Sequence, residues 1–226
     1  MEQIIFPLSN LDFYHPEEFI NSISNQKVYD KIKGWKKSWG TLPYQFSLLI
    51  YGPKSSGKTY ITKIWQNLSG ATVLKNNHIF NGSIINHYQT FIIEDIENWL
   101  EEDVLHYFNL INERQKYLLI TTSNLDINFK LKDLSSRIKS IMRLELKEPD
   151  DELMKILLFK IFSNNSIQVS RMIMDFLLVN LPRQFNQIID SIERINQFAL
   201  KTKRKITIKL IKQVLDINGV IGELDL

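Results

Sequence analysis

Hydrophobic runs and helical stripes alternate along the first two thirds of the chain. Residues 46–51 (FSLLIY) form an apolar run that ends at a glycine, which is typical of a strand buried on both faces. In residues 58–68 the apolar side chains recur every third or fourth position, as on one face of a helix. Further strands are expected at 71–74, 90–93, 117–121 and 141–146, with a helix at 101–112. This alternation predicts the α/β class, with a parallel sheet covered by helices.

The pattern becomes purely helical after Pro149. Apolar pairs recur every four residues in DELMKILLFKIF (151–162), a spacing that only a helix places on one face. Two more helical stretches follow at 172–179 and 185–199, and Thr207 has the position of an N-cap for a last helix. We therefore divide the chain into an N-terminal peptide (1–12), an α/β domain (13–148) and a small all-helical domain (149–226).

Composition and charge narrow the function classes. At 226 residues, with 44% hydrophobic and 23% charged residues, the chain has the composition of a soluble globular protein. It has no cysteine, which excludes disulfides and thiolate metal sites, and its four histidines are scattered. The net charge of +3 is more typical of a solvated surface than of a nucleic-acid footprint. No secretory signal or apolar run of about 18 residues is visible, so we expect a cytoplasmic protein with no membrane contact.

The segment GPKSSGKT (52–59) follows a predicted strand and opens a predicted helix, and it fits the phosphate-binding pattern G-x-x-x-x-G-K-[ST]. Its glycines let backbone N–H groups turn toward phosphate, Lys58 reaches the β- and γ-phosphates, and Thr59 can hold Mg²⁺. The start of the following helix adds a positive dipole end. The pattern predicts binding of ADP or ATP with Mg²⁺. The expected nucleotide-binding residues are Gly52, Pro53, Lys54, Ser55, Ser56, Gly57, Lys58, Thr59 and Tyr60.

An acidic pair follows the strand expected at 90–93. In TFIIEDIENW, Glu94 is predicted to support Mg²⁺ and Asp95 to orient the attacking water. The order Glu–Asp departs from the usual pairs, which shifts both carboxylates by about 1.5 Å, and errors of ~1 Å can lower a rate about 100-fold. We expect nucleotide binding with weak hydrolysis by the chain itself. Asn124, after the next strand, is a candidate sensor of the γ-phosphate, with a simple turn asparagine as the alternative.

These elements together resemble the DnaA-related AAA+ family, and within it the Hda-type regulators in their alphaproteobacterial form. The resemblance runs over nearly the whole chain. It rests on EEFINSISN, GPKSSGKT, IEDI, ITTSN, LKDLSSRI, EPDDELMKILLFKIF, RQFNQIIDSI and KRKITIKLIKQVL. It implies an AAA+ P-loop domain at 13–148 and a helical lid at 149–226. It also implies that Arg137 is an arginine finger acting in trans on a partner's nucleotide, and that Arg183 is a second sensor arginine near the chain's own nucleotide.

The N-terminal QIIFPL is similar to the peptide by which Hda-type proteins dock on the DNA polymerase III sliding clamp. By that match Gln3 hydrogen-bonds at the rim of the clamp pocket while Phe6 and Leu8 fill it. The resemblance implies a negative regulator of DNA replication initiation. It would stimulate ATP hydrolysis by the initiator DnaA together with the DNA-loaded clamp, the process called regulatory inactivation of DnaA. Its partners would be DnaA and the clamp, and a homodimer stays open.

Two alternatives remain at the level of sequence. One is a self-hydrolysing AAA+ ATPase, such as a helicase loader, which needs Glu94 and Asp95 to work as a competent pair. The other is a non-catalytic adaptor that binds the clamp or the initiator and holds a structural nucleotide. Because the chain ends after the lid, we expect it to lack the initiator's helix-turn-helix domain and to bind no specific DNA sequence.

Overall fold

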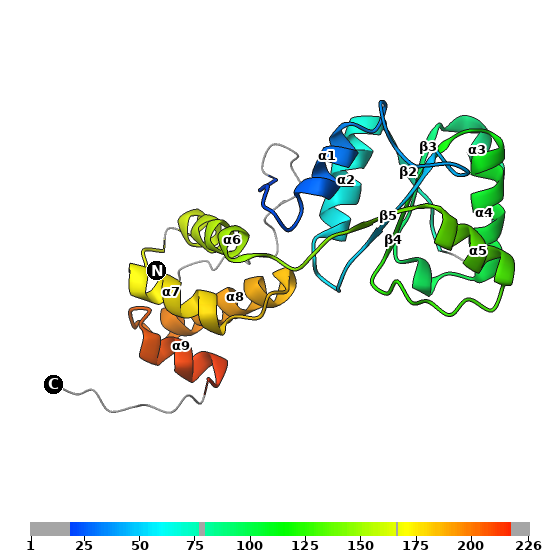
Figure 1. Cartoon of the computed structure of the whole chain (residues 1–226). Helices are drawn as coiled ribbons and strands as arrows, with labels where there is room; N and C mark the ends of the chain where they lie inside the picture. The colour runs from blue at the N-terminus through cyan, green and yellow to red at the C-terminus, as the bar shows by residue number, and fades with distance from the viewer. Residues whose placement is uncertain (1–18, 77–79, 166, 218–226) are drawn as a thin grey trace. The chain divides into compact units, whose positions relative to one another are not determined.

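The structure is a computed structural model that describes residues 19–76, 80–165 and 167–217 (Figure 1). It divides into two compact units, and the division lies between Glu148 and Pro149. The first unit is built on a five-stranded parallel sheet with the strand order β2-β3-β4-β1-β5. The strands are β1 (Ser47–Tyr51), β2 (Thr72–Val73), β3 (Thr90–Ile93), β4 (Tyr117–Thr122) and β5 (Met142–Glu145). The predicted α/β class is confirmed.

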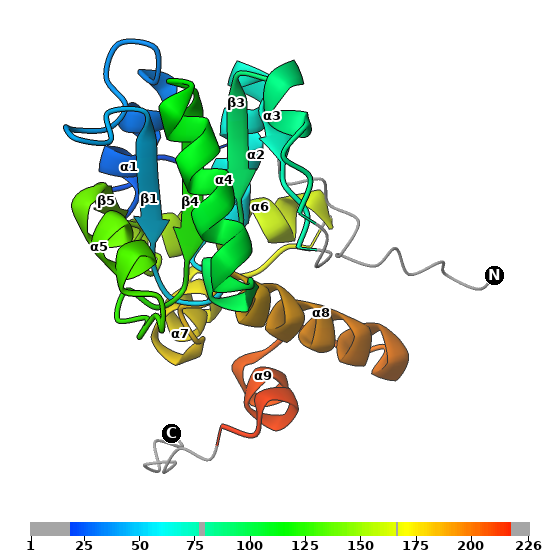
Figure 2. The same cartoon turned by 90° about the vertical axis from the view of Figure 1, so that its right-hand side faces the viewer.

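Helices cover both faces of this sheet (Figure 1). One face carries α1 (Gln26–Lys33) and α2 (Lys58–Ser69), and the other carries α3 (Ile84–His87), α4 (Glu101–Glu113) and α5 (Lys132–Ser140). A short 3₁₀ turn, η3 (Ile96–Asn98), follows β3. Because every strand is parallel, the carboxyl ends of all strands lie at the same edge of the sheet. Figure 2 shows β1 and β4 running in the same direction.

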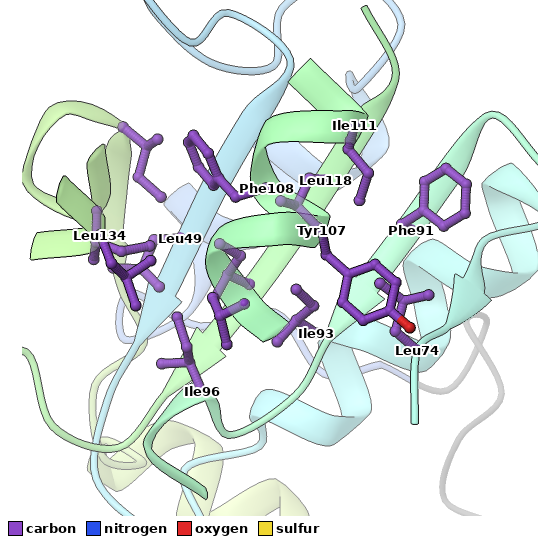
Figure 3. Close-up of a cluster of buried hydrophobic side chains, with 14 of the residues drawn as sticks. Leu49, Leu74, Phe91, Ile93, Ile96, Tyr107, Phe108, Ile111, Leu118 and Leu134 are labelled. Atoms are coloured by element: carbon purple, nitrogen blue, oxygen red, sulfur yellow. The ribbon is translucent and has the colours of Figure 1, made fainter. Parts of the chain in front are cut away.

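The two sheet faces bury two separate cores, which explains why the strands are apolar at consecutive positions. Trp65 of α2 is fully buried against the face that carries Leu48 and Ile50. On the opposite face, Phe108 of α4 packs over the side that carries Leu49 (Figure 3). Successive strand residues therefore enter different cores, and neither face of β1 is left to solvent.

The second unit is all-helical within the described residues. It consists of α6 (Asp151–Asn164), α7 (Arg171–Asn180), α8 (Phe185–Thr202) and α9 (Ile208–Leu215). Three of these helices begin at a side-chain cap: Asp150, Ser170 and Thr207 each accept a hydrogen bond from the backbone N–H three residues later. The predicted N-cap at Thr207 is confirmed.

The sequence pattern and the structure differ mainly in the shortest elements. β2 is only two residues long, although the flanking Ala71 and Leu74 are buried and the Leu74 N–H donates to the carbonyl of Ile92 in β3. Before β1, the described residues form one helix, α1. Among the described residues, no helix is both long and apolar enough to cross a membrane.

Candidate functional site

The phosphate-binding pattern forms a tight turn between the end of β1 and the start of α2. Gly57, directly before α2, has a φ of +98°, a left-handed conformation that glycine adopts without strain. Ser55 is also left-handed, with a φ of +57°. Gly52 is needed for a different reason, because a Cβ there would lie 2.1 Å from the carbonyl oxygen of Leu146. The chain from β1 thus passes close against the end of β5 before it turns.

Replacement of Gly52 by alanine is expected to lower the free energy of unfolding by about 1–3 kcal/mol, since backbone atoms cannot move aside as a flexible side chain can. Urea denaturation of the two proteins measures this. Gly34→Ala is the matched control, because Gly34 has an ordinary φ of −86° and its new Cβ would lie 3.2 Å from the nearest atom. Equal stability of the Gly52→Ala protein and the wild type would contradict the close approach.

Lys58 folds back over the turn. Its Nζ donates to the carbonyl oxygens of Gly52 at 2.8 Å and Pro53 at 2.9 Å, and the residue is only 7% exposed. Burial lowers the pKa of Lys58, and the negative charges of Asp95 and Glu97 oppose that shift. An anion bound in the turn would act in the same direction as these carboxylates and favour the charged ammonium.

Ser56 supplies an unsatisfied donor in the same turn. The residue is 4% exposed, and its Oγ has no hydrogen-bond partner among the described residues. Buried hydroxyls are normally hydrogen-bonded, so an orphan beside a lysine and a helix start fits a missing acceptor such as a phosphate oxygen. The residues present in the turn therefore fit a nucleotide phosphate.

Glu94 lies next to the turn, at the carboxyl end of β3. Its Oε1 accepts a hydrogen bond of 2.5 Å from the hydroxyl of Thr62, which lies three residues after Thr59 in α2. The structure thus brings the predicted Mg²⁺-supporting carboxylate to the helix that carries the predicted Mg²⁺-binding threonine. Among the described residues no three carboxylates or histidines are arranged to hold a metal ion, so Mg²⁺ here would need phosphate oxygens as further ligands.

Asp95 adopts a left-handed backbone conformation with a φ of +48°. Its N–H donates to the hydroxyl of Thr121 in β4 at 3.0 Å, and the residue is exposed. Left-handed non-glycine residues cost free energy and tend to persist where the surrounding structure holds them in place, often at functional sites. The hydrogen bond from the Asp95 N–H to Thr121 is such a restraint, and it fixes the start of the loop that follows β3.

Asn124 lies in a turn at the end of β4. Its Oδ1 accepts from the N–H of Asp126 at 2.9 Å, and its own N–H donates to the Thr122 hydroxyl at 3.1 Å. This is the turn arrangement that the sequence left open as the alternative. The sensor role of Asn124 stays a prediction.

Glu97 is a third acidic residue of this edge, and sequence reasoning missed it. Its Oε1 accepts hydrogen bonds from the N–H of Ser123, at 2.8 Å, and from the Ser123 hydroxyl, while its Oε2 is buried without a partner in the described chain. Burial alone would raise the pKa of Glu97, but several hydrogen bonds, those from Ser123 foremost, together outweigh it and the pKa lies below its ordinary value. Glu97 thereby ties the segment after β3 to the tip of β4.

Arg137 lies in the last turn of α5, and its guanidinium is held on two sides. Nε and Nη2 each donate to a different carboxylate oxygen of Asp133, both at 3.0 Å. Nη1 donates to the hydroxyl of Tyr44 at 3.2 Å. The hydrogen bonds from Arg137 to Asp133 are the main reason that its pKa is raised above the ordinary arginine value. The side chain is 28% exposed.

The contact with Tyr44 places Arg137 at the edge of the sheet opposite the phosphate turn. Tyr44 precedes β1, whereas the turn follows it, and a strand of five residues spans about 17 Å. A cavity of about 370 Å³ lies beside Arg137, and it is lined by Pro43, Tyr44, Gln45, Phe46, Asn109, Asn112, Glu113, Gln115 and Arg137. Residues 43–46 and 115 of this lining come shortly before β1 and β4. Arg137 is therefore far from the nucleotide that its own chain would bind.

The remaining predicted residues lie in other places. Arg183 donates to the carbonyl of Pro149 at 3.1 Å and to Oδ1 of Asp151 at 2.5 Å, so it binds the start of α6 within the helical unit. Its second-sensor role stays a prediction. Tyr60 stacks on Phe19, with ring centroids 5.3 Å apart. The predicted clamp-binding residues Gln3, Phe6 and Leu8 lie outside the described residues.

Comparison with known proteins finds a family model that matches the helical unit and a curated relative of most of the chain. Residues 150–215 match the family model described as "Hda, lid domain". Over 225 residues the chain is 21% identical to the chromosomal replication initiator protein DnaA of Wolinella succinogenes, covering 88% of this chain and 51% of that protein. The chain thus spans about half the length of this curated relative.

Solved structures share the fold. Domain III of the Thermotoga maritima replication initiation protein DnaA superposes with a TM-score of 0.70 at 16% identity, covering 91% of this chain and 96% of that one. AMPPCP-bound DnaA from Aquifex aeolicus superposes with a TM-score of 0.64 at 18% identity, covering 84% of this chain and 68% of that one. The Thermotoga maritima RuvB Holliday junction branch migration motor superposes with a TM-score of 0.68 at 13% identity, covering 90% of this chain and 72% of that one. Together with the lid match, these findings show that the chain has the fold of the DnaA structures and that its residues 150–215 match the lid domain of Hda.

Proposed function

We propose that this protein binds an adenine nucleotide with Mg²⁺ and is a negative regulator of replication initiation. It would stimulate hydrolysis of the ATP held by DnaA, together with the DNA-loaded sliding clamp. The observation that carries the proposal is the match of residues 150–215 to the Hda lid, in a chain whose curated relative is an initiator. The position of Arg137, away from its own phosphate turn, supports an action in trans.

In this proposal the phosphate turn holds the protein's own nucleotide. The Lys58 ammonium and the Ser56 hydroxyl would contact phosphate oxygens, and the backbone between Gly52 and Gly57 would surround them. Mg²⁺, held through Thr59 and Glu94, would neutralise phosphate charge when bound. The likeness to DnaA bound to AMPPCP supports the choice of an adenine nucleotide. In this proposal the protein's own nucleotide is not the substrate of the stimulated reaction.

Arg137 carries the stimulating activity. Its charge is permanent, and the paired bonds to Asp133 and Tyr44 hold the guanidinium in one orientation. On meeting DnaA, the guanidinium exchanges water, and part of its contact with Asp133, for the oxygens of the partner's ATP. A positive charge at that place stabilises the charge that develops on the transferred phosphoryl group. Arg137 thus acts on the reaction without any change in its own chain's nucleotide.

Clamp binding brings the two proteins together on DNA. Gln3, Phe6 and Leu8 would dock on the clamp, as expected from their match to the family's peptide. Replacement of Phe6 by alanine removes an aromatic anchor from an apolar pocket, a class of change that commonly costs about 2 kcal/mol or more, or roughly 30-fold in affinity. We expect the Phe6→Ala protein to need correspondingly higher concentrations to stimulate DnaA.

The experiment measures hydrolysis of DnaA-bound ATP with the wild type and with Phe6→Ala, each with and without DNA-loaded clamp. The proposal requires stimulation by the wild type that depends on the clamp, and a right-shifted titration for the variant. Binding to the clamp without any change in hydrolysis would favour the adaptor. Turnover of ATP by this protein alone, stimulated by single-stranded DNA, would favour the self-hydrolysing ATPase, for which the restrained conformation of Asp95 is the supporting observation.

A further inference from the structure

The lid carries a concentrated group of cations, which we name the lid basic patch. Six basic residues and no acidic ones occur between positions 201 and 215. Because the whole chain has a net charge of only +3, the rest of it is net negative. The lid basic patch consists of Lys201, Lys203, Arg204, Lys205, Lys209 and Lys212. The net positive charge of the protein therefore comes from one short stretch.

The fold brings these cations together from two helices and the loop between them. The turn after α8 is closed by the N–H groups of Lys203 and Arg204, which donate to the carbonyls of Leu200 and Ala199. α9 then packs beside α8 (Figure 2). Arg204 contacts the helix that follows it, α9, where its Nη1 donates to Oε1 of Gln213 at 3.3 Å. Lys209 lies four positions before Gln213 and so shares its helix face, which places two cations side by side.

The internal contacts of the lid do not explain this arrangement. Lys201, Lys203, Lys205 and Lys209 are exposed, and none forms an ion pair with a described residue. Lys201, in the last turn of α8, is favoured by the helix dipole. Lys209 is in the opposite situation, because it lies in the first turn of α9, where the dipole disfavours a cation and no acidic residue is present. A cluster of exposed cations that forms no ion pair with the described residues leaves its charge available to an external anion.

We propose that the lid basic patch binds the phosphate backbone of duplex DNA without regard to sequence. Lysine dominates the patch, and lysines act as point charges on phosphates and lack the planar fork with which arginine reads a guanine edge. A membrane surface fits less well, since a helix that lies on lipid must offer an apolar face, and Leu210 and Ile211 of α9 are fully buried in the lid. The proposed function places the protein on clamped DNA but gives it no DNA contact of its own.

The test is fluorescence anisotropy of a labelled duplex of arbitrary sequence with the full chain, titrated at several salt concentrations. The variant is Lys201→Gln/Lys205→Gln/Lys209→Gln. Each lost phosphate contact should remove about 0.9 from the slope of log affinity against log salt, so three lower it by roughly 2.7. We expect at least about 10-fold weaker binding near 0.1 M salt. The matched control, Lys27→Gln/Lys37→Gln/Lys155→Gln, removes the same charge from exposed sites elsewhere and should bind almost as the wild type does.

A second variant separates charge from folding. Lys201→Arg/Lys205→Arg/Lys209→Arg keeps the charge and should keep duplex binding. Equal melting temperatures of the arginine and glutamine variants would show that both are folded to the same extent. Duplex binding by the glutamine variant equal to that of the wild type would overturn the proposal, as would an equal loss in the control. Patch-dependent binding to phosphatidylglycerol vesicles, with unchanged duplex binding, would overturn it in favour of a lipid surface. DnaA is absent from this experiment, so its result is independent of the proposed regulatory function.

Discussion

Replacement of Arg137 by alanine is expected to lower the stimulation of DnaA-bound ATP hydrolysis by about 10³-fold or more, the usual range for an arginine finger supplied in trans. Such a factor corresponds to about 4 kcal/mol or more of barrier. Nucleotide binding by the variant itself should be unchanged, because Arg137 and the phosphate turn lie at opposite edges of the sheet. Single-turnover hydrolysis on DnaA, with saturating protein and clamp, measures the effect.

The stability of the Arg137→Ala protein should change little. The pair with Asp133 is an exposed contact one helical turn apart, a class that contributes about 0.3–0.5 kcal/mol. Lys139→Ala is the matched control, since Lys139 is an exposed cation of the same helix. Arg137→Lys keeps the charge but loses the planar fork, so it should recover only a small part of the activity. Full stimulation by Arg137→Ala would remove Arg137 from the mechanism.

Replacement of Lys58 by alanine is expected to weaken nucleotide binding by about 10–100-fold, because hydrogen bonds to charged groups contribute about 1.5–3 kcal/mol. The loss should be near the upper end, since Lys58 is buried and water replaces its contacts poorly. Isothermal titration with ADP and with ATP measures it. Nucleotide should also raise the unfolding temperature of the wild type and leave that of the variant nearly unchanged.

Lys75→Ala provides the control for charge, since Lys75 is exposed in the same unit and follows β2, which is separated from β1 by β3 and β4 in the sheet. Its nucleotide affinity should equal that of the wild type. An affinity of Lys58→Ala within a few-fold of the wild type would show that the turn does not hold phosphate through this lysine.

Much of the fold follows from local sequence because its strands are parallel and buried. A strand covered on both faces is apolar at consecutive positions, so residues 90–93 were expected as a strand and form β3 without any shift. The helix that starts after the phosphate turn begins at Lys58, as expected from the motif. At Thr207 the cap could be predicted because an N-cap depends only on the three residues that follow it.

The contacts that shape the site could not be predicted in this way, because they join distant parts of the chain. Ser123 meets Glu97 only because β3 and β4 are neighbours in the sheet, and nothing in IEDIENW distinguishes Glu97 from a solvated carboxylate. Arg137 and Tyr44 are 93 positions apart. The left-handed Asp95 is likewise held by the hydrogen bond that its N–H donates to the Thr121 hydroxyl in β4. Local patterns contain none of this information, since it arises from strand order.

The central claim is that the chemistry takes place on the partner's nucleotide. The most direct measurement preloads DnaA with γ-labelled ATP, adds this protein carrying unlabelled nucleotide, and follows the release of labelled phosphate on DNA-loaded clamp. The account predicts fast release of the label with the wild type and its loss with Arg137→Ala. Labelled ATP that stays intact on DnaA, while the unlabelled nucleotide of this protein is hydrolysed, would contradict the account.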